Sequence, residues 1–174
     1  MLRLRAFRQS EGFCGPASLK MVLGYFGVEK SEKALAKLAG STRAFGTPAK
    51  GLVQAAEKLG FKAMVRDESK FSDIAVLLKR EIPVIVNWFS TQEGHYSIVV
   101  GLDAKKISLL DPETGTIRNI PREVFLQIWF DFEARKPYSK ETLILRRMIV
   151  VQPAAKTTSP SRTATASRRG KKAR

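Results

Sequence analysis

Residues 8–19 read RQSEGFCGPASL and contain the only cysteine of the chain, Cys14. Apolar side chains follow at the three- and four-residue spacing of one helix face, at Leu19, Val22, Leu23 and Phe26. Gly27 can supply the left-handed residue that ends a helix. This stretch predicts a helix that begins at the cysteine.

The first half of the sequence predicts more helices than strands. Three further helices are indicated by their N-terminal signals: Ser31, Thr47 with Pro48 in the first turn, and Ser72. Between the last two, alternation from Phe61 to Val65 predicts a strand.

The second half is dominated by short β-branched runs. These are IPVIVNW (82–88), HYSIVVGL (95–102), KKISLLD (105–111), GTIRNI (115–120) and the closing TLILRRMIVV (142–151), with one helical piece, PREVFLQIW (121–129). Helices that come first and strands that come later favour an α+β fold, with N-terminal helices packed on a C-terminal antiparallel sheet.

Charge is unevenly distributed along the 174 residues, which carry a formal net charge of +15. Residues 152–174 contain seven basic and no acidic residues, and no Val, Leu, Ile or aromatic residue. Such a segment cannot bury enough apolar area to offset its ordering entropy. We therefore expect a folded domain over 1–151 and a basic disordered tail over 152–174. The tail either contacts an acidic partner, such as nucleic acid, an anionic membrane or an acidic protein, or only solubilises the chain.

Compartment follows from the cysteine count and the apolar runs. One cysteine forms no internal disulfide, and the N-terminus lacks the pattern of a signal peptide. No run approaches the roughly 20 apolar residues that span a bilayer. A cytoplasmic protein without a transmembrane segment is the expectation.

Cys14 is placed where a thiol can react. The partial positive charge at a helix N-terminus favours the thiolate, and a nearby imidazolium favours it further. The only histidine, His95, opens a predicted strand, and Asp111 ends the next one before Pro112. A turn between the two strands would bring His95 and Asp111 together, which completes a nucleophile, a base and an orienting carboxylate.

Gln9 lies just upstream of the nucleophile and can donate a hydrogen bond to a developing oxyanion, together with the backbone N–H of Cys14. Each residue also has an ordinary interpretation: a buried apolar cysteine, a core histidine, an aspartate that caps a turn. The joint pattern favours chemistry. One Cys and one His do not make a four-ligand zinc site, so neither a metal nor an organic cofactor is predicted.

The sequence resembles a papain-like cysteine peptidase, and more closely the bacteriocin-processing (double-glycine leader) peptidase family. The resemblance rests on QSEGFCGPASLKMVLGYFG, GTPAKGLVQAAEKLGFKAMV, EIPVIVNWF and GHYSIVVGLDAKKISLLDPETG, in family order. It implies Cys14 as nucleophile, His95 as general base and acid, Asp111 as the residue that orients His95, and Gln9 as oxyanion donor. The interval from Gln9 to Cys14 is five, where related enzymes usually have six.

These observations favour a cysteine peptidase that hydrolyses a peptide or isopeptide bond in a peptide or protein substrate. Two alternatives stay open. QSEGFCG is also similar to the opening of phytochelatin synthases, which implies acyl or γ-glutamylcysteine transfer. The domain can also be a catalytically silent, peptidase-like binding module.

Overall fold

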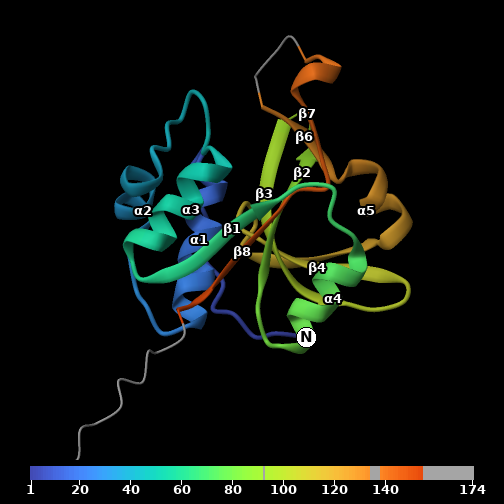
Figure 1. Ribbon diagram of the computed structural model, residues 1–174, viewed down its shortest axis with the longest axis horizontal. Coiled ribbons are helices and arrows are strands. Elements are labelled where there is room, and N and C mark those ends of the chain that lie inside the picture. Colours follow the sequence, from blue (N-terminus) through green and yellow to red (C-terminus); the bar gives the residue numbers. More distant parts are fainter. Residues whose placement is uncertain (92, 134–137, 155–174) are drawn as a thin grey trace, which may run out of the picture.

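The computed structural model describes residues 1–91, 93–133 and 138–154. Helices come first, strands dominate later, and both are shown in Figure 1. The helices are α1 (Cys14–Tyr25), α2 (Glu32–Ala39), α3 (Ala49–Lys58), α4 (Phe71–Lys79), α5 (Arg122–Ile128) and the 3-10 helix η1 (Lys140–Thr142). The strands are β1 (Phe61–Arg66), β2 (Val84–Ser90), β3 (Glu93–Leu102), β4 (Lys106–Asp111), β5 (Thr116–Pro121), β6 (Phe130–Phe132), β7 (Leu143–Leu145) and β8 (Met148–Pro153).

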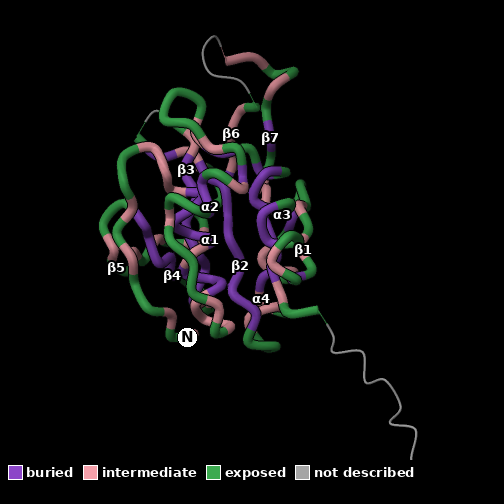
Figure 2. The backbone as a smooth tube through the Cα atoms, turned by 90° about the vertical axis from the view of Figure 1, so that its left-hand side faces the viewer, coloured by how far each residue is buried: buried purple, intermediate pink, exposed green. Residues whose placement is uncertain are grey.

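Six strands form one antiparallel sheet in the order β1-β8-β2-β3-β4-β5, and β6 pairs with β7 in a small second sheet. The central strands β2 and β3 are largely buried, whereas β5 at one edge is mostly exposed (Figure 2). One apolar core lies between the sheet and α1, α2 and α3, and a second lies between the opposite face and α4 and α5. Helices therefore cover both faces of the sheet (Figure 1).

α1 is the central helix of the first core. It begins at Cys14, and eight of its 12 residues are buried. The chain leaves it through Gly27, whose φ of 82° is the left-handed conformation that a glycine adopts without strain. The N–H of Val28 then returns to the carbonyl of Leu23 at 2.9 Å. These observations confirm the predicted start and end of this helix.

Two predicted helix starts are wrong by one or two residues. α3 begins at Ala49 with Pro48 as its N-cap, because the hydroxyl of Thr47 donates to Ser41 Oγ at 2.9 Å and does not cap the helix. α4 begins at Phe71, ahead of Ser72, since the carboxylate of Asp73 accepts the backbone N–H of Lys70 at 2.8 Å and closes the first turn.

The closing run 142–151 is two strands and not one. Arg146 has a φ of 48°, which breaks the extended backbone between β7 and β8. β7 pairs with β6, whereas β8 pairs with β1 and β2 in the main sheet. β8 continues to Pro153, two residues past the expected limit of the folded domain. The rest of the expected tail, from residue 155 on, lies outside the described residues.

The contact between α2 and α3 depends on a missing side chain. A Cβ built on Gly51 would collide with the carbonyl oxygen of Ala39, which is backbone and cannot rotate away. We expect Gly51→Ala to lower the free energy of unfolding by about 1–3 kcal/mol, because the two helices must separate. Urea unfolding followed by circular dichroism measures this loss.

Gly24→Ala in α1 is the matched control. Its added Cβ would lie 3.5 Å from the nearest side-chain atom, which is ordinary contact. Because alanine costs less backbone entropy in a helix, this variant should be neutral or more stable by up to about 1 kcal/mol. Equal losses from Gly51→Ala and Gly24→Ala would contradict the packing argument.

Candidate active site

Cys14 is the first residue of α1 and is half-buried. The N-cap residue, Phe13, makes no side-chain hydrogen bond to the first turn, so no cap competes for the N–H groups there. Gly15 allows Thr47 to pack closely beside Cys14, because a Cβ at position 15 would lie 2.8 Å from the side chain of Thr47. The thiol therefore stands at a helix N-terminus beside the loop that leads into α3.

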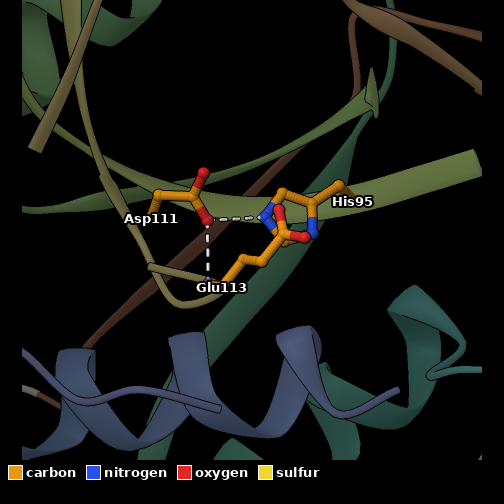
Figure 3. A group of neighbouring side chains, drawn as sticks. All are labelled: His95, Asp111 and Glu113. Carbon is orange, nitrogen blue, oxygen red and sulfur yellow. Dashed lines mark hydrogen bonds and ion pairs between the residues drawn. The ribbon is translucent and has the colours of Figure 1, made fainter. Parts of the chain in front are cut away.

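His95 and Asp111 come from neighbouring strands. Ile98 on β3 pairs with Leu110 on β4, which puts Asp111 level with Ser97 and makes His95 its diagonal neighbour. His95 Nε2 and Asp111 Oδ1 are 2.8 Å apart, and both residues are buried (Figure 3). With Nε2 donating to the carboxylate, Nδ1 is the ring nitrogen that remains for the thiol of Cys14, which is close enough to His95 to raise the pKa of the imidazole.

Asp111 is a fully buried carboxylate held by three donors. Besides His95, the backbone N–H of Glu113 donates to Oδ1 at 2.9 Å, and Arg118 Nη1 donates to Oδ2 at 2.9 Å. Burial alone raises the pKa of Asp111, but the hydrogen bond and charge of His95, with the donors from Arg118 and Glu113, lower it to about 2. Asp111 is therefore ionised at neutral pH.

The pKa of His95 shifts in the opposite direction to that of Asp111. Burial alone lowers its pKa, but hydrogen bonds to Asp111 and Cys14 and the negative charges of both raise it from 6.5 to about 9. The edge of the ring also packs against Trp88, with ring centroids 5.7 Å apart and an interplanar angle of 77°. At neutral pH the imidazole is protonated and fixed in orientation.

Gln9 lies on the N-terminal segment, which is tied to the turn after Asp111. Its backbone N–H donates to the carbonyl of Pro112 at 2.8 Å, and Arg8 Nε donates to the carbonyl of Glu113 at 3.2 Å. Its side-chain Oε1 is buried and has no hydrogen-bond partner among the described residues. Gln9, the oxyanion donor expected from the sequence, is therefore linked through its backbone to the turn that follows Asp111.

Three further contributors to the site were not identified from the sequence. Thr47 packs on Gly15 and accepts a hydrogen bond from Tyr96 Oη at its carbonyl, 3.2 Å away. Arg118 and Glu113 reach Asp111 from the hairpin that follows it. Only their spacing in LLDPETGTIR suggests the last two, since a tight hairpin after Asp111 returns the chain past its carboxylate.

His95, Asp111 and Glu113 carry the kinds of side-chain atom that metal ions bind. Ligand atoms of His95, Asp111 and Glu113 lie within 4.8 Å of one another (Figure 3). His95 and Asp111, the two buried members, are already hydrogen-bonded to each other. The second carboxylate oxygen of Asp111 is ion-paired with Arg118, whose positive charge disfavours a cation there. We therefore assign no metal site to this group.

Within the described part of the chain, no helix combines the length and the apolar character needed to cross a bilayer.

A model of the Peptidase C39 family matches residues 6–132 of the chain. An uncharacterized protein of Methanothermobacter marburgensis is 42% identical over 124 residues, which are 70% of this chain and 80% of that protein. A lactococcin transport/processing ATP-binding protein, LcnC-like, of Lactococcus lactis is 36% identical over 120 residues. That match covers 67% of this chain, which spans only 16% of the length of the lactococcal protein.

Solved structures share the fold. The peptidase domain of Streptococcus ComA, a bi-functional ABC transporter, superposes with a TM-score of 0.66 at 20% identity, covering 88% of this chain and 100% of that one. A double glycine motif protease from an AMS/PCAT transporter, solved with its leader peptide, gives 0.65 at 22% identity, with 87% and 93% covered. These likenesses confirm the predicted α+β, papain-like fold, and together with the family match they establish that the chain belongs to the peptidase C39 family.

Proposed function

We propose that this protein is a cysteine peptidase that hydrolyses peptide bonds with Cys14 as nucleophile, His95 as general acid and base, and Asp111 as the residue that orients His95. The observation that carries the proposal is the 2.8 Å hydrogen bond between His95 Nε2 and the buried carboxylate of Asp111. It leaves the other ring nitrogen for the thiol of Cys14, which interacts with His95 and raises the pKa of the imidazole. Membership of the peptidase C39 family supports the same reaction class.

In the acylation step, the Cys14 thiolate attacks the carbonyl carbon of the scissile peptide bond. The imidazolium of His95 gives its proton to the leaving amine nitrogen as the C–N bond breaks, which leaves a thioester on Cys14. In the second step, neutral His95 takes a proton from water, and the hydroxide attacks the thioester. The products are a free carboxylic acid and the restored Cys14–His95 pair.

The oxyanion of both steps needs donors in front of the sulfur. The backbone N–H of Cys14 lies at the start of α1, where helix geometry supplies no carbonyl partner. We propose the side-chain amide of Gln9 as the second donor. The backbone hydrogen bond from Gln9 to the carbonyl of Pro112 supports this role, because it holds Gln9 against the turn that follows Asp111.

We propose a peptide with two glycines before the scissile bond as the substrate. The support comes from the solved double glycine motif protease with its leader peptide, whose fold this chain shares. Transfer of the acyl group to an amine or thiol in place of water uses the same residues. A catalytically silent module would use the same site for binding alone.

The direct test is cleavage of a synthetic peptide that contains Gly-Gly, beside the same peptide with Ala-Ala. We expect two fragments, the first ending in a free glycine carboxylate, from the Gly-Gly peptide only. Cys14→Ser should lower the cleavage rate at least about 10³-fold, because the hydroxyl that replaces the thiol is a much weaker nucleophile in this site. Mass spectrometry with and without added glutathione separates hydrolysis from transfer. Peptide binding without any cleavage would favour the silent module.

The reactivity of the thiol gives a second prediction. At pH 6.5 iodoacetamide should alkylate Cys14 at least about tenfold faster than it alkylates free glutathione, because protonated His95 stabilises the thiolate. His95→Ala should remove most of this advantage. Since Cys14 is the only cysteine, whole-protein mass reports its alkylation directly. A rate equal to that of glutathione and unaffected by His95→Ala would sink the catalytic assignment.

The protonation of His95 fixes the alkaline side of the pH profile. Its pKa of about 9 means that the imidazolium, which protonates the leaving amine, is lost as the pH rises through about 9. We expect kcat/KM for the peptide to fall tenfold per pH unit above that point. Asp111, with a pKa of about 2, titrates well below the working range and adds no limb there. An alkaline limb near pH 6.5 would show that His95 is not held by Asp111 and Cys14.

A further inference from the structure

Arg118 contacts two separate parts of the candidate active site from the edge strand β5. Its Nη1 donates to Oδ2 of Asp111 at 2.9 Å, the oxygen that His95 does not use. Its guanidinium also lies over the ring of Trp88, 5.3 Å from the centroid. The side chain is 41% exposed, so Arg118 reaches inward from the surface.

Trp88 is the aromatic neighbour of His95. The two residues are directly opposite in the pairing of β2 with β3, and the rings meet edge to face. Trp88 Nε1 donates to Ser97 Oγ at 3.0 Å, which fixes the indole ring. Arg118 therefore touches both Asp111 and Trp88, the two side chains that hold His95 from the sheet side.

We propose that Arg118 is a positioning residue of this site. It fixes the orientation of Asp111 and covers the ring of Trp88, and its positive charge partly offsets the negative charge of Asp111 that acts on His95. The inference rests on the proposed peptidase function for its consequence in catalysis. Its structural basis is the ion pair with Asp111 and the stacking on Trp88, neither of which involves substrate.

The groups around His95 are mostly negative. Cys14 faces it from α1, Asp111 from β4, and Glu113 from the turn after β4. On β6, Asp131 lies against Gly94, where an added Cβ would collide with its carboxylate. Against these groups, Arg118 supplies positive charge through its ion pair with Asp111. Removing it should leave Asp111 more negative toward His95 and should strengthen the hold on the imidazolium proton.

The test measures the protonation of His95 without using a substrate. His95 is the only histidine in the chain, so ¹³C-histidine labelling gives one imidazole signal whose titration needs no assignment. Arg118→Gln should move the titration midpoint upward by about 0.5–1 pH unit, a three- to tenfold change in the protonation equilibrium. Arg118→Lys keeps the charge and should stay near the wild-type midpoint.

Arg122→Gln is the matched control. The guanidinium of Arg122 also stacks on an aromatic ring, that of Phe71 at 4.5 Å, but its hydrogen bond goes to the carbonyl of Asp103 and not to the site. This variant loses the same charge and a similar stacking contact. Its His95 midpoint should equal that of the wild-type protein.

Turnover of the Gly-Gly peptide supplies the second readout. Arg118→Gln should lower kcat about tenfold with little change in KM, because the residue acts on His95 and not on the substrate. Arg118→Lys should recover part of the loss, since a lysine keeps the charge without the planar donor geometry.

Two results would overturn the proposal: a His95 midpoint in Arg118→Gln equal to wild type, or equal shifts in Arg118→Gln and Arg122→Gln. Thermal unfolding of each variant shows whether it is folded, and Arg118→Lys provides a second, milder change at the same position. If the wild-type protein cleaves no peptide while the midpoint still depends on Arg118, the peptidase proposal fails and the control of His95 by Arg118 stands.

Discussion

The hydrogen bond between His95 and Asp111 depends on the register of β3 with β4 and on the hairpin that follows β4. It requires a charged carboxylate with no solvent exposure, which costs several kcal/mol unless donors surround it. The β4–β5 hairpin supplies those donors, one from the backbone of Glu113 and one from the side chain of Arg118. Between Val99 and Gly101 the pairing of β3 with β4 shifts register, so the alignment near His95 is set locally by the pairs at 98 and 99.

The helical half of the site is attached to the same turn. The N-terminal segment runs across the sheet, with the N–H of Leu2 bonded to the carbonyl of Val100 and that of Gln9 bonded to the carbonyl of Pro112. On the other side of α1, the buried hydroxyl of Tyr96 bonds to the carbonyl of Thr47. These bonds fix the segments before and after Cys14 to β3 and to the turn after β4, close to His95 and Asp111.

Local signals predicted much of this arrangement. The helix at Cys14 was readable from its apolar stripe and from Gly27, and the strands were readable from β-branched runs that end at turn residues. The Cys, His and Asp were found as candidates because the sequence places each at or near the end of such an element; in the structure Cys14 begins α1, Asp111 ends β4, and His95 is the third residue of β3. Their catalytic roles, unlike the fold and the family, remain a proposal.

Features that depend on distant partners were not readable. Thr47 has the residue type of an N-cap, but its hydroxyl donates a hydrogen bond to Ser41 and its side chain packs on Gly15. The closing run looked continuous because the left-handed backbone of Arg146 falls on a residue type that gives no turn signal. Arg118 looks like any exposed residue of an edge strand until the hairpin folds it over Asp111.

The central claim is that this fold makes Cys14 a nucleophile toward a peptide carbonyl. The measurement that tests it most directly is the mass of the protein quenched in acid during turnover of a Gly-Gly peptide. The account predicts a thioester adduct equal to the N-terminal fragment less one water, located on the peptide that contains Cys14. An adduct on any other residue, or undiminished cleavage of the peptide by Cys14→Ala, would contradict it.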